Sequence, residues 1–281
     1  PPHAEPAGRW TAARPAVVPR SAWRPISRRR HPPELTASAV KAVFIHHTNS
    51  GNDYTPKDVP ELIRNLSHDH VANREWDDVG YNFLVDRNGT IYEGRAGGVA
   101  NPVVGAHTQG FNVGTVGIAA IGSYGSGTTV PAPMLEAIAR LAAWKLGLYG
   151  VDPRASTVLV STNDHSRYPE GSRHVFRTIS GHRDATWTWC PGTALHALLP
   201  DIRERAARLQ GRRDDESPEP VEPRQRAEAP APGSLDPVDP FSPIDPFRPF
   251  DLFGASDTSG APGYGGASAL GMGDGCLQPD G

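Results

Sequence analysis

Short apolar and β-branched runs along the chain predict its strands. Two of these runs are almost continuously apolar, which is the pattern of strands buried on both faces. Two others flank Asn88-Gly89, the dipeptide that most favours a tight hairpin turn. The predicted strands cover residues 42–45, 81–85, 90–92, 116–121 and 175–179.

Three segments carry the spacing of amphipathic helices. Thr55 is the predicted N-cap of the first, and Pro56 is its predicted first helical residue. One face of this helix, which His70 continues, is apolar at Val59, Leu62, Ile63 and Leu66. The other two helices are predicted over residues 134–149 and 193–209. Strands and helices mix without regular βαβ alternation, so we predict an α/β fold with one central sheet flanked by helices.

Composition divides the chain into three parts. Residues 1–16 are rich in Pro and Ala and are expected to be disordered. Residues 17–211 form one predicted domain, with Trp23 as an anchor onto its surface. Residues 212–281 lack periodicity and contain three hexads, each with Pro second, Asp fourth and Phe last. We expect this tail to be an extended, disordered spacer, and its spaced Phe residues offer a docking motif as the alternative.

Charge separates the domain from the tail. Residues 1–211 carry 23 Lys and Arg against 18 Asp and Glu, whereas the tail carries 5 against 13. The mildly basic body suits a polyanionic surface, but its charge is too small to indicate nucleic-acid binding. No apolar run approaches the ~20 residues of a membrane span. The Pro- and Ala-rich start, with neither initiator Met nor signal peptide, is typical of a processed mature end and favours export.

The strongest chemical signal lies between Ser180 and Gly192. His182 and Cys190 stand eight residues apart in a segment whose Trp, Thr and Pro-Gly residues predict a loop. A nitrogen and sulfur pair suits zinc, and the best further donor is the His46-His47 pair that ends a predicted strand. The second of the two cysteines, Cys276, lies in the Gly-rich tail, so a structural disulfide framework is not expected.

Catalytic zinc takes three protein ligands, and His46, His182 and Cys190 supply two nitrogens and one sulfur. For amide hydrolysis the developing oxyanion needs a donor, for which Tyr81 and Thr188 are the candidates. A nucleophilic Cys190 with a histidine base is the competing interpretation, and spacing leaves both open.

Five linked motifs appear in order: FIHHT at 44–48, WDDVGYNF at 76–83, IYEGR at 91–95, GAHT at 105–108, and GHRD at 181–184 followed by CPG at 190–192. In these motifs the chain resembles the peptidoglycan recognition proteins, or type 2 N-acetylmuramoyl-L-alanine amidases, in a bacterial, actinobacterial-like version. The resemblance covers roughly residues 17–209. It implies a secreted or cell-wall enzyme, expected to be a monomer, that binds peptidoglycan.

The resemblance also implies roles for individual residues. His46, His182 and Cys190 would be the zinc ligands, with Tyr81 and Thr188 stabilising the oxyanion. His70, Trp76, His107 and Asn112 match positions that line the family's peptidoglycan groove. The implied reaction hydrolyses the amide between the lactyl group of N-acetylmuramic acid and L-alanine of the stem peptide. Asp184 would be a general base or, equally, would orient His182.

Three alternatives and three departures accompany this resemblance. The alternatives are a peptidoglycan-binding module without catalysis, a zinc peptidase acting within the stem peptide, and a cysteine hydrolase. The chain lacks the cysteines that many relatives carry near the first helix, and residues 161–173 form a longer insertion that could border the groove. Bulky Trp187 and Trp189 flank Thr188 and affect the direction in which its hydroxyl can donate a hydrogen bond.

Overall fold

The computed structural model describes residues 10–25 and 36–213 of the chain. The predictions made for residues 1–9, for the tail from residue 214 with its three hexads, and for Cys276 lie outside the described residues.

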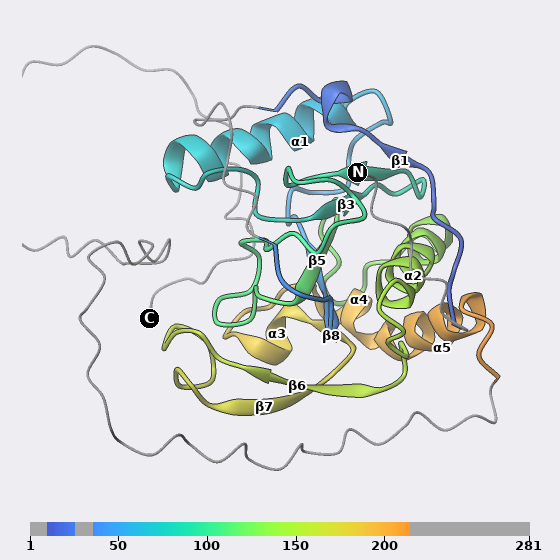
Figure 1. Ribbon diagram of the computed structural model, residues 1–281. Helices are drawn as coiled ribbons and strands as arrows, with labels where there is room; N and C mark the ends of the chain where they lie inside the picture. The colour runs from blue at the N-terminus through green and yellow to red at the C-terminus, as the bar shows by residue number, and fades with distance from the viewer. Residues whose placement is uncertain (1–9, 26–35, 214–281) are drawn as a thin grey trace, which may run out of the picture. The chain divides into compact units, whose positions relative to one another are not determined.

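The described residues form a mixed six-stranded sheet, a two-stranded sheet and flanking helices (Figure 1). The strands are β1 (Val17–Val18), β2 (Ala42–His47), β3 (Phe83–Val85), β4 (Ile91–Glu93), β5 (Thr115–Ala120), β6 (Ser156–Val160), β7 (Arg173–Arg177) and β8 (Ile179–Gly181). The helices are η1 (Arg20–Ala22), α1 (Val59–His68), η2 (Asp69–Asn73), α2 (Ala132–Gly147), α3 (His182–Ala185), α4 (Thr193–Ala197) and α5 (Leu199–Leu209). The predicted α/β class is confirmed.

The large sheet has the order β1-β4-β3-β5-β2-β8, and all neighbours except β3 and β4 are parallel. The antiparallel pair is the predicted hairpin, with Gly89 at a φ of +84° in its turn. Because β2 lies between β5 and β8, the carboxyl ends of these three strands meet at one edge of the sheet.

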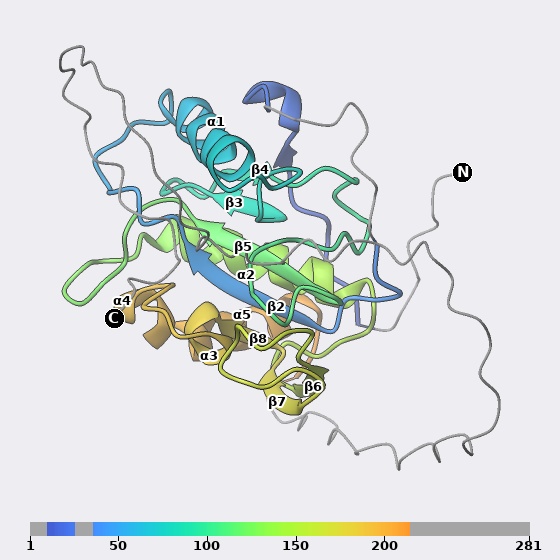
Figure 2. The ribbon, with the colours of Figure 1, turned by 90° about the vertical axis from the view of Figure 1, so that its left-hand side faces the viewer.

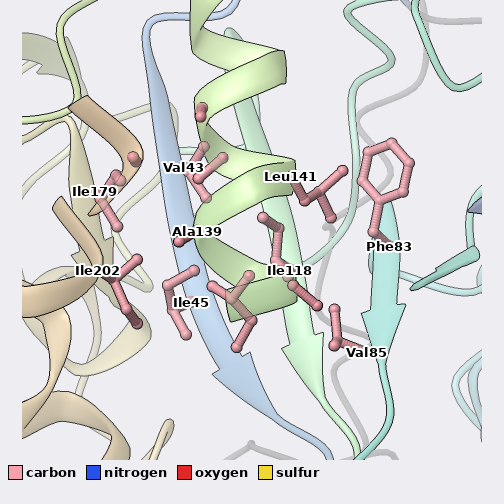
Figure 3. Packing of buried hydrophobic residues seen from close by; sticks show 14 of the residues in the cluster. Val43, Ile45, Phe83, Val85, Ile118, Ala139, Leu141, Ile179 and Ile202 are labelled. Carbon is pink, nitrogen blue, oxygen red and sulfur yellow. The ribbon is translucent and has the colours of Figure 1, made fainter. Parts of the chain in front are cut away.

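Helices cover both faces of this sheet (Figure 2). On one face, Ala139 and Leu141 of α2 pack over Val43, Ile45 and Ile118 (Figure 3), with Ile202 of α5 in the same cluster. On the other face, α1 contributes Val59 and Ile63 to a second cluster with Leu84, Ala119 and buried Trp23. Trp23 is fully buried and donates from Nε1 to the carbonyl oxygen of Glu93 at 2.9 Å, which makes it the predicted anchor. No helix in the described ranges combines the length and apolar character that a membrane span requires.

Several predicted boundaries differ from the observed ones. The first helix begins at Val59, because the carboxylate of Asp58 accepts from both the backbone N and the hydroxyl of Thr55 and closes a separate turn before it. The domain also extends before residue 17. Ala12 packs against the core, and the Arg14 guanidinium lies 5.6 Å from the Trp144 ring centroid.

Two predicted elements are each divided in two. The predicted strand over residues 175–179 separates at Thr178 into β7, which pairs with β6, and β8, which pairs with β2. The predicted helix over residues 193–209 separates at Leu198 into α4 and α5. Pro200 is in the first turn of α5, where its missing N–H and fixed φ favour the start of a helix. The β6 strand has no counterpart among the predicted elements.

Candidate metal centre

The side chains of the two histidines at the end of β2 point to opposite faces of the sheet. Successive strand residues point to opposite sides, so His46 shares its side with Phe44 while His47 shares its side with Ile45. The Nδ1 atom of His47 accepts from the backbone N of Tyr124 at 3.3 Å. His46 is fully buried and faces the edge where β2 meets β8. Of the pair, His46 is therefore the donor available to a site there.

His182 and Cys190 reach the same place by separate routes. His182 directly follows β8, whose Gly181 lies in register with Ile45 of β2, and the rings of His46 and His182 are 4.5 Å apart between centroids. The Sγ atom of Cys190 lies 3.7 Å from Nδ1 of His46 and accepts from the backbone N of His47 at 3.3 Å. Taking one ligand atom from each of His46, His182 and Cys190, all three lie within 4.8 Å of one another.

Burial fixes the protonation state of these imidazoles. Burial, followed by the charges of neighbouring histidines, holds the pKa of His46 well below 6.5. Burial, with a smaller contribution from His47, lowers the pKa of His182 to about 3. Both rings are therefore neutral at pH 7, the form that ligates metals. The buried Nδ1 atom of His182 has no hydrogen-bond partner among the described residues. An unpaired nitrogen beside a second nitrogen and a sulfur fits a zinc ion.

Comparison with known proteins identifies the family. A family model described as N-acetylmuramoyl-L-alanine amidase (Amidase_2) matches residues 36–193, more than half of the 281 residues. The chain belongs to this family. A peptidoglycan-recognition protein of Drosophila melanogaster is 34% identical over 142 residues, which are 50% of this chain and 74% of that protein.

Two further relatives extend the comparison. An N-acetylmuramoyl-L-alanine amidase of Mus musculus is 29% identical over 194 residues, covering 66% of this chain and 30% of that protein. The structure of peptidoglycan recognition protein-LE in complex with tracheal cytotoxin, a monomeric diaminopimelic acid-type peptidoglycan, aligns with a TM-score of 0.51 and 28% identity. That alignment covers 66% of this chain and 93% of the other. The predicted membership of the peptidoglycan recognition family is confirmed.

Tyr81, a predicted catalytic residue of this amidase-family domain, lies beside His46. Their ring centroids are 5.1 Å apart, and Tyr81 is buried. Burial raises the pKa of Tyr81 well above 10, with a smaller opposing effect from Arg74, so the phenol stays protonated at neutral pH. A protonated phenol next to the candidate ligands is a hydrogen-bond donor for a developing oxyanion.

His70 and Trp76, two predicted groove residues, form an aromatic pair next to Tyr81. Their ring centroids are 4.7 Å apart, and His70 lies 5.7 Å from Tyr81. His70 is in η2, a π-helical turn that extends α1 and carries this side chain inward. Its Nδ1 atom accepts from the backbone N of Gly80 at 3.1 Å. Burial lowers the pKa of His70 to about 4, so this ring is also neutral.

His107 contacts the centre from the loop before β5. Its Nδ1 atom lies 3.3 Å from Nε2 of His46 and 3.0 Å from Oγ1 of Thr108. Gly117 of β5 makes room for this ring, since a Cβ atom there would lie 2.4 Å from the His107 Cγ. Asn112 has a structural contact, because its Oδ1 accepts from the backbone N atoms of His107 and Thr108 at 2.8 and 2.9 Å.

Thr108 is a residue that the sequence-based assignment of roles omitted. Its hydroxyl oxygen lies 3.4 Å from Nε2 of His46 and thus belongs to the same buried polar cluster. Its position directly after His107 within the 105–108 motif is the signal that points to it. Thr188, by contrast, was proposed as an oxyanion donor, and its Oγ1 accepts from the backbone N of Cys190 at 3.2 Å. That contact leaves the hydroxyl proton of Thr188 available for donation.

Asp184 makes contacts other than the one with His182 that was expected. One carboxylate oxygen accepts from the backbone N of Gly181 at 2.8 Å, and the other lies 2.9 Å from Nε2 of His196. Its contacts therefore fix the start of α3 and the position of His196, and they do not orient the His182 ring. Asp184 and His196 line a cavity of about 520 Å³ together with Arg177 and Arg203, and none of the three candidate ligands lines that cavity.

The oxidation state of Cys190 decides whether its sulfur can bind a metal. Cys190 is disulfide-bonded in this structure. A disulfide sulfur cannot be deprotonated, and the thiolate is the metal-binding form of cysteine. The nitrogen, nitrogen and sulfur set therefore fits zinc only when Cys190 is reduced.

Proposed function

We propose that this chain is a zinc-dependent N-acetylmuramoyl-L-alanine amidase that cleaves the amide between the lactyl group of N-acetylmuramic acid and L-alanine of the stem peptide. The observation that carries this proposal is the convergence of one ligand atom each from His46, His182 and Cys190 within 4.8 Å. The family match and the relatives named for peptidoglycan recognition support the substrate class. Because that substrate lies outside the cytoplasmic membrane, the proposal includes a secreted or wall-associated location.

The residues around the centre have distinct tasks in this proposal. Bound zinc supplies a Lewis acid and lowers the pKa of water towards about 7. His46, His182 and reduced Cys190 hold the ion. Tyr81 donates its phenol proton in a hydrogen bond to the developing oxyanion, with Thr188 as a second donor. His70 and Trp76 line the groove next to Tyr81, and His107 contacts His46 directly.

A peptidoglycan-binding module without catalysis is the second candidate. The disulfide at Cys190 favours it, since the oxidised protein lacks its sulfur ligand but keeps the buried rings of the groove. Under reducing conditions the two candidates predict opposite results on purified cell-wall sacculi.

Metal analysis combined with product analysis tests the proposal. We expect one zinc per chain in the reduced wild-type protein, and loss of both zinc and hydrolysis in His46→Ala and Cys190→Ala. His47→Ala is the matched control, because its ring faces Tyr124, and it should retain zinc. Mass spectrometry should find intact stem peptides released from muramic acid.

Three results would contradict the proposal in different ways. Shortened stem peptides indicate a peptidase. Chelator-resistant hydrolysis that a thiol alkylator abolishes indicates a cysteine hydrolase. Peptidoglycan binding without any hydrolysis by the reduced, zinc-loaded protein indicates the binding module.

A further inference from the structure

Two tryptophans in the loop that leads to Cys190 are exposed. Trp187 is 60% exposed and Trp189 is 76% exposed, and they are the only aromatic residues among the exposed large hydrophobic side chains of the described ranges. Trp23 and Trp144, in contrast, are buried. An indole offers a large apolar surface that gains free energy on contact with a partner, so exposed aromatic pairs mark binding surfaces.

Backbone contacts hold the loop that carries these tryptophans. The carbonyl oxygen of Trp189 accepts from the backbone N of Gly192 at 2.7 Å, and that of Cys190 accepts from Arg183 at 2.9 Å. Gly192 has a φ of +89°, and a Cβ atom there would lie 2.2 Å from the carbonyl oxygen of Tyr124. The loop is thus fixed against the rest of the domain, which lowers the entropy cost of binding through its side chains.

The inserted segment 161–173 supports one of the two indoles. The Arg167 guanidinium lies 4.2 Å from the ring centroid of Trp187, which is a cation–π contact. Arg167 is itself held, because its backbone N donates to Ala185 and its Nη1 donates to Arg183, at 2.9 and 3.1 Å. Trp187 remains mostly exposed despite this contact, so it keeps surface for a ligand.

We propose that Trp187 and Trp189 form a platform on which N-acetylated pyranose rings of the glycan strand stack. This inference rests on the proposed function, which fixes where the sugar must lie. The scissile amide is attached to muramic acid through its lactyl group, so a pyranose ring must sit a few bonds from the candidate ligands. Trp189 is the residue before Cys190, and both indoles flank Thr188.

The chemistry of the two surfaces is complementary. The C–H bonds on a pyranose face carry partial positive charge, and the face of an indole carries partial negative charge. His70 and Trp76 form a separate aromatic pair next to Tyr81. The platform would therefore bind the sugar while that pair contacts the peptide, and the scissile amide would lie between them.

Oligosaccharide binding tests this platform without requiring hydrolysis. The probe is the hexamer of N-acetylglucosamine, which has neither lactyl group nor stem peptide, and its affinity is measured by calorimetry. We expect the wild-type protein to bind it, and the Trp187→Ala/Trp189→Ala double variant to bind it at least about fivefold more weakly. Trp187→Phe/Trp189→Phe should retain most of the affinity. Val175→Ala, which changes a side chain that is 70% exposed on β7, should bind like wild type.

The outcomes separate the platform from the amidase proposal. Equal affinity of wild type and the double alanine variant, or no hexamer binding by wild type, overturns the platform and leaves the amidase proposal standing. Tryptophan-dependent hexamer binding by a protein that hydrolyses no sacculi supports the platform and removes the amidase proposal. Kinetics on sacculi should show the double alanine variant with a KM raised at least about fivefold and with unchanged zinc content.

Discussion

The Nδ1 atom of His46 lies 3.7 Å from the Sγ atom of Cys190, although 144 residues separate them in the chain. Parallel pairing of β2 with β8 places the end of β2 beside His182, which begins α3. The backbone N of Arg183 donates to the carbonyl oxygen of Cys190 at 2.9 Å and holds Cys190 next to that helix. The contact joins a neutral imidazole to a sulfur whose oxidation state decides whether it can ligate a metal. This pair therefore controls the function proposed for the chain.

Reduction of Cys190 should switch on zinc binding. Cys190 is disulfide-bonded, and only its reduced thiolate can ligate a metal. We expect the oxidised protein to bind little zinc and to hydrolyse sacculi slowly, and a phosphine reductant to restore both. Zinc content, intact mass and hydrolysis before and after reduction measure this, and full zinc occupancy in the oxidised wild type would contradict it.

Replacement of the Tyr81 hydroxyl should slow the reaction without releasing the metal. Tyr81→Phe keeps the buried ring next to His46 but removes the donor of the oxyanion hydrogen bond. Loss of one such donor costs about 100- to 1,000-fold in kcat. We expect this decrease together with unchanged zinc content and a nearly unchanged KM. A kcat within about threefold of wild type would mean that Tyr81 is a packing residue.

Acid should destabilise the metal-free protein through its buried histidines. The pKa of His70 is about 4 in the folded state and 6.5 ordinarily, so between these values the unfolded chain binds the additional proton. Stability is therefore full above pH 6.5 and decreases as the pH falls towards 4. His70 alone should account for about 2 kcal/mol of the loss by pH 5.

Urea unfolding of chelator-treated protein at pH 7.5 and 5 measures this effect. His70→Gln should lose less stability over the interval than wild type, because glutamine does not titrate. His68→Gln, which changes an exposed histidine in the last turn of α1, is the matched control and should follow wild type. Equal losses in all three proteins would show that His70 does not contribute.

A methyl group at Gly117 should disturb the His107 ring. A Cβ atom at this position would approach three atoms of His107 to between 2.4 and 2.9 Å. We expect Gly117→Ala to cost about 1–3 kcal/mol of stability through overpacking and to weaken peptidoglycan binding. Gly125→Ala is the control, because a Cβ atom there would meet nothing within 4 Å. Thermal unfolding and sacculus binding measure both effects, and wild-type behaviour of Gly117→Ala would contradict the expectation.

Local signals in the sequence determined much of the fold. The Asn88-Gly89 turn and its flanking apolar residues specify the β3–β4 hairpin without help from distant residues. The continuous apolar runs mark β2 and β5 as buried, and the motifs around His46, His182 and Cys190 name the candidate donors. These features depend on residues close together in the chain, which is why pattern and turn chemistry are sufficient for them.

The tertiary structure alone decided which atoms meet. A strand buried on both faces has no polar side, so its sequence cannot tell whether His46 or His47 points into the site; that depends on which face α2 covers. The division of residues 173–181 between two sheets arises from pairing with β6 and β2, which are far apart in the sequence. The contact of Asp184 with His196 likewise depends on the folded chain, because the spacing of these two residues in the sequence carries no signal for it.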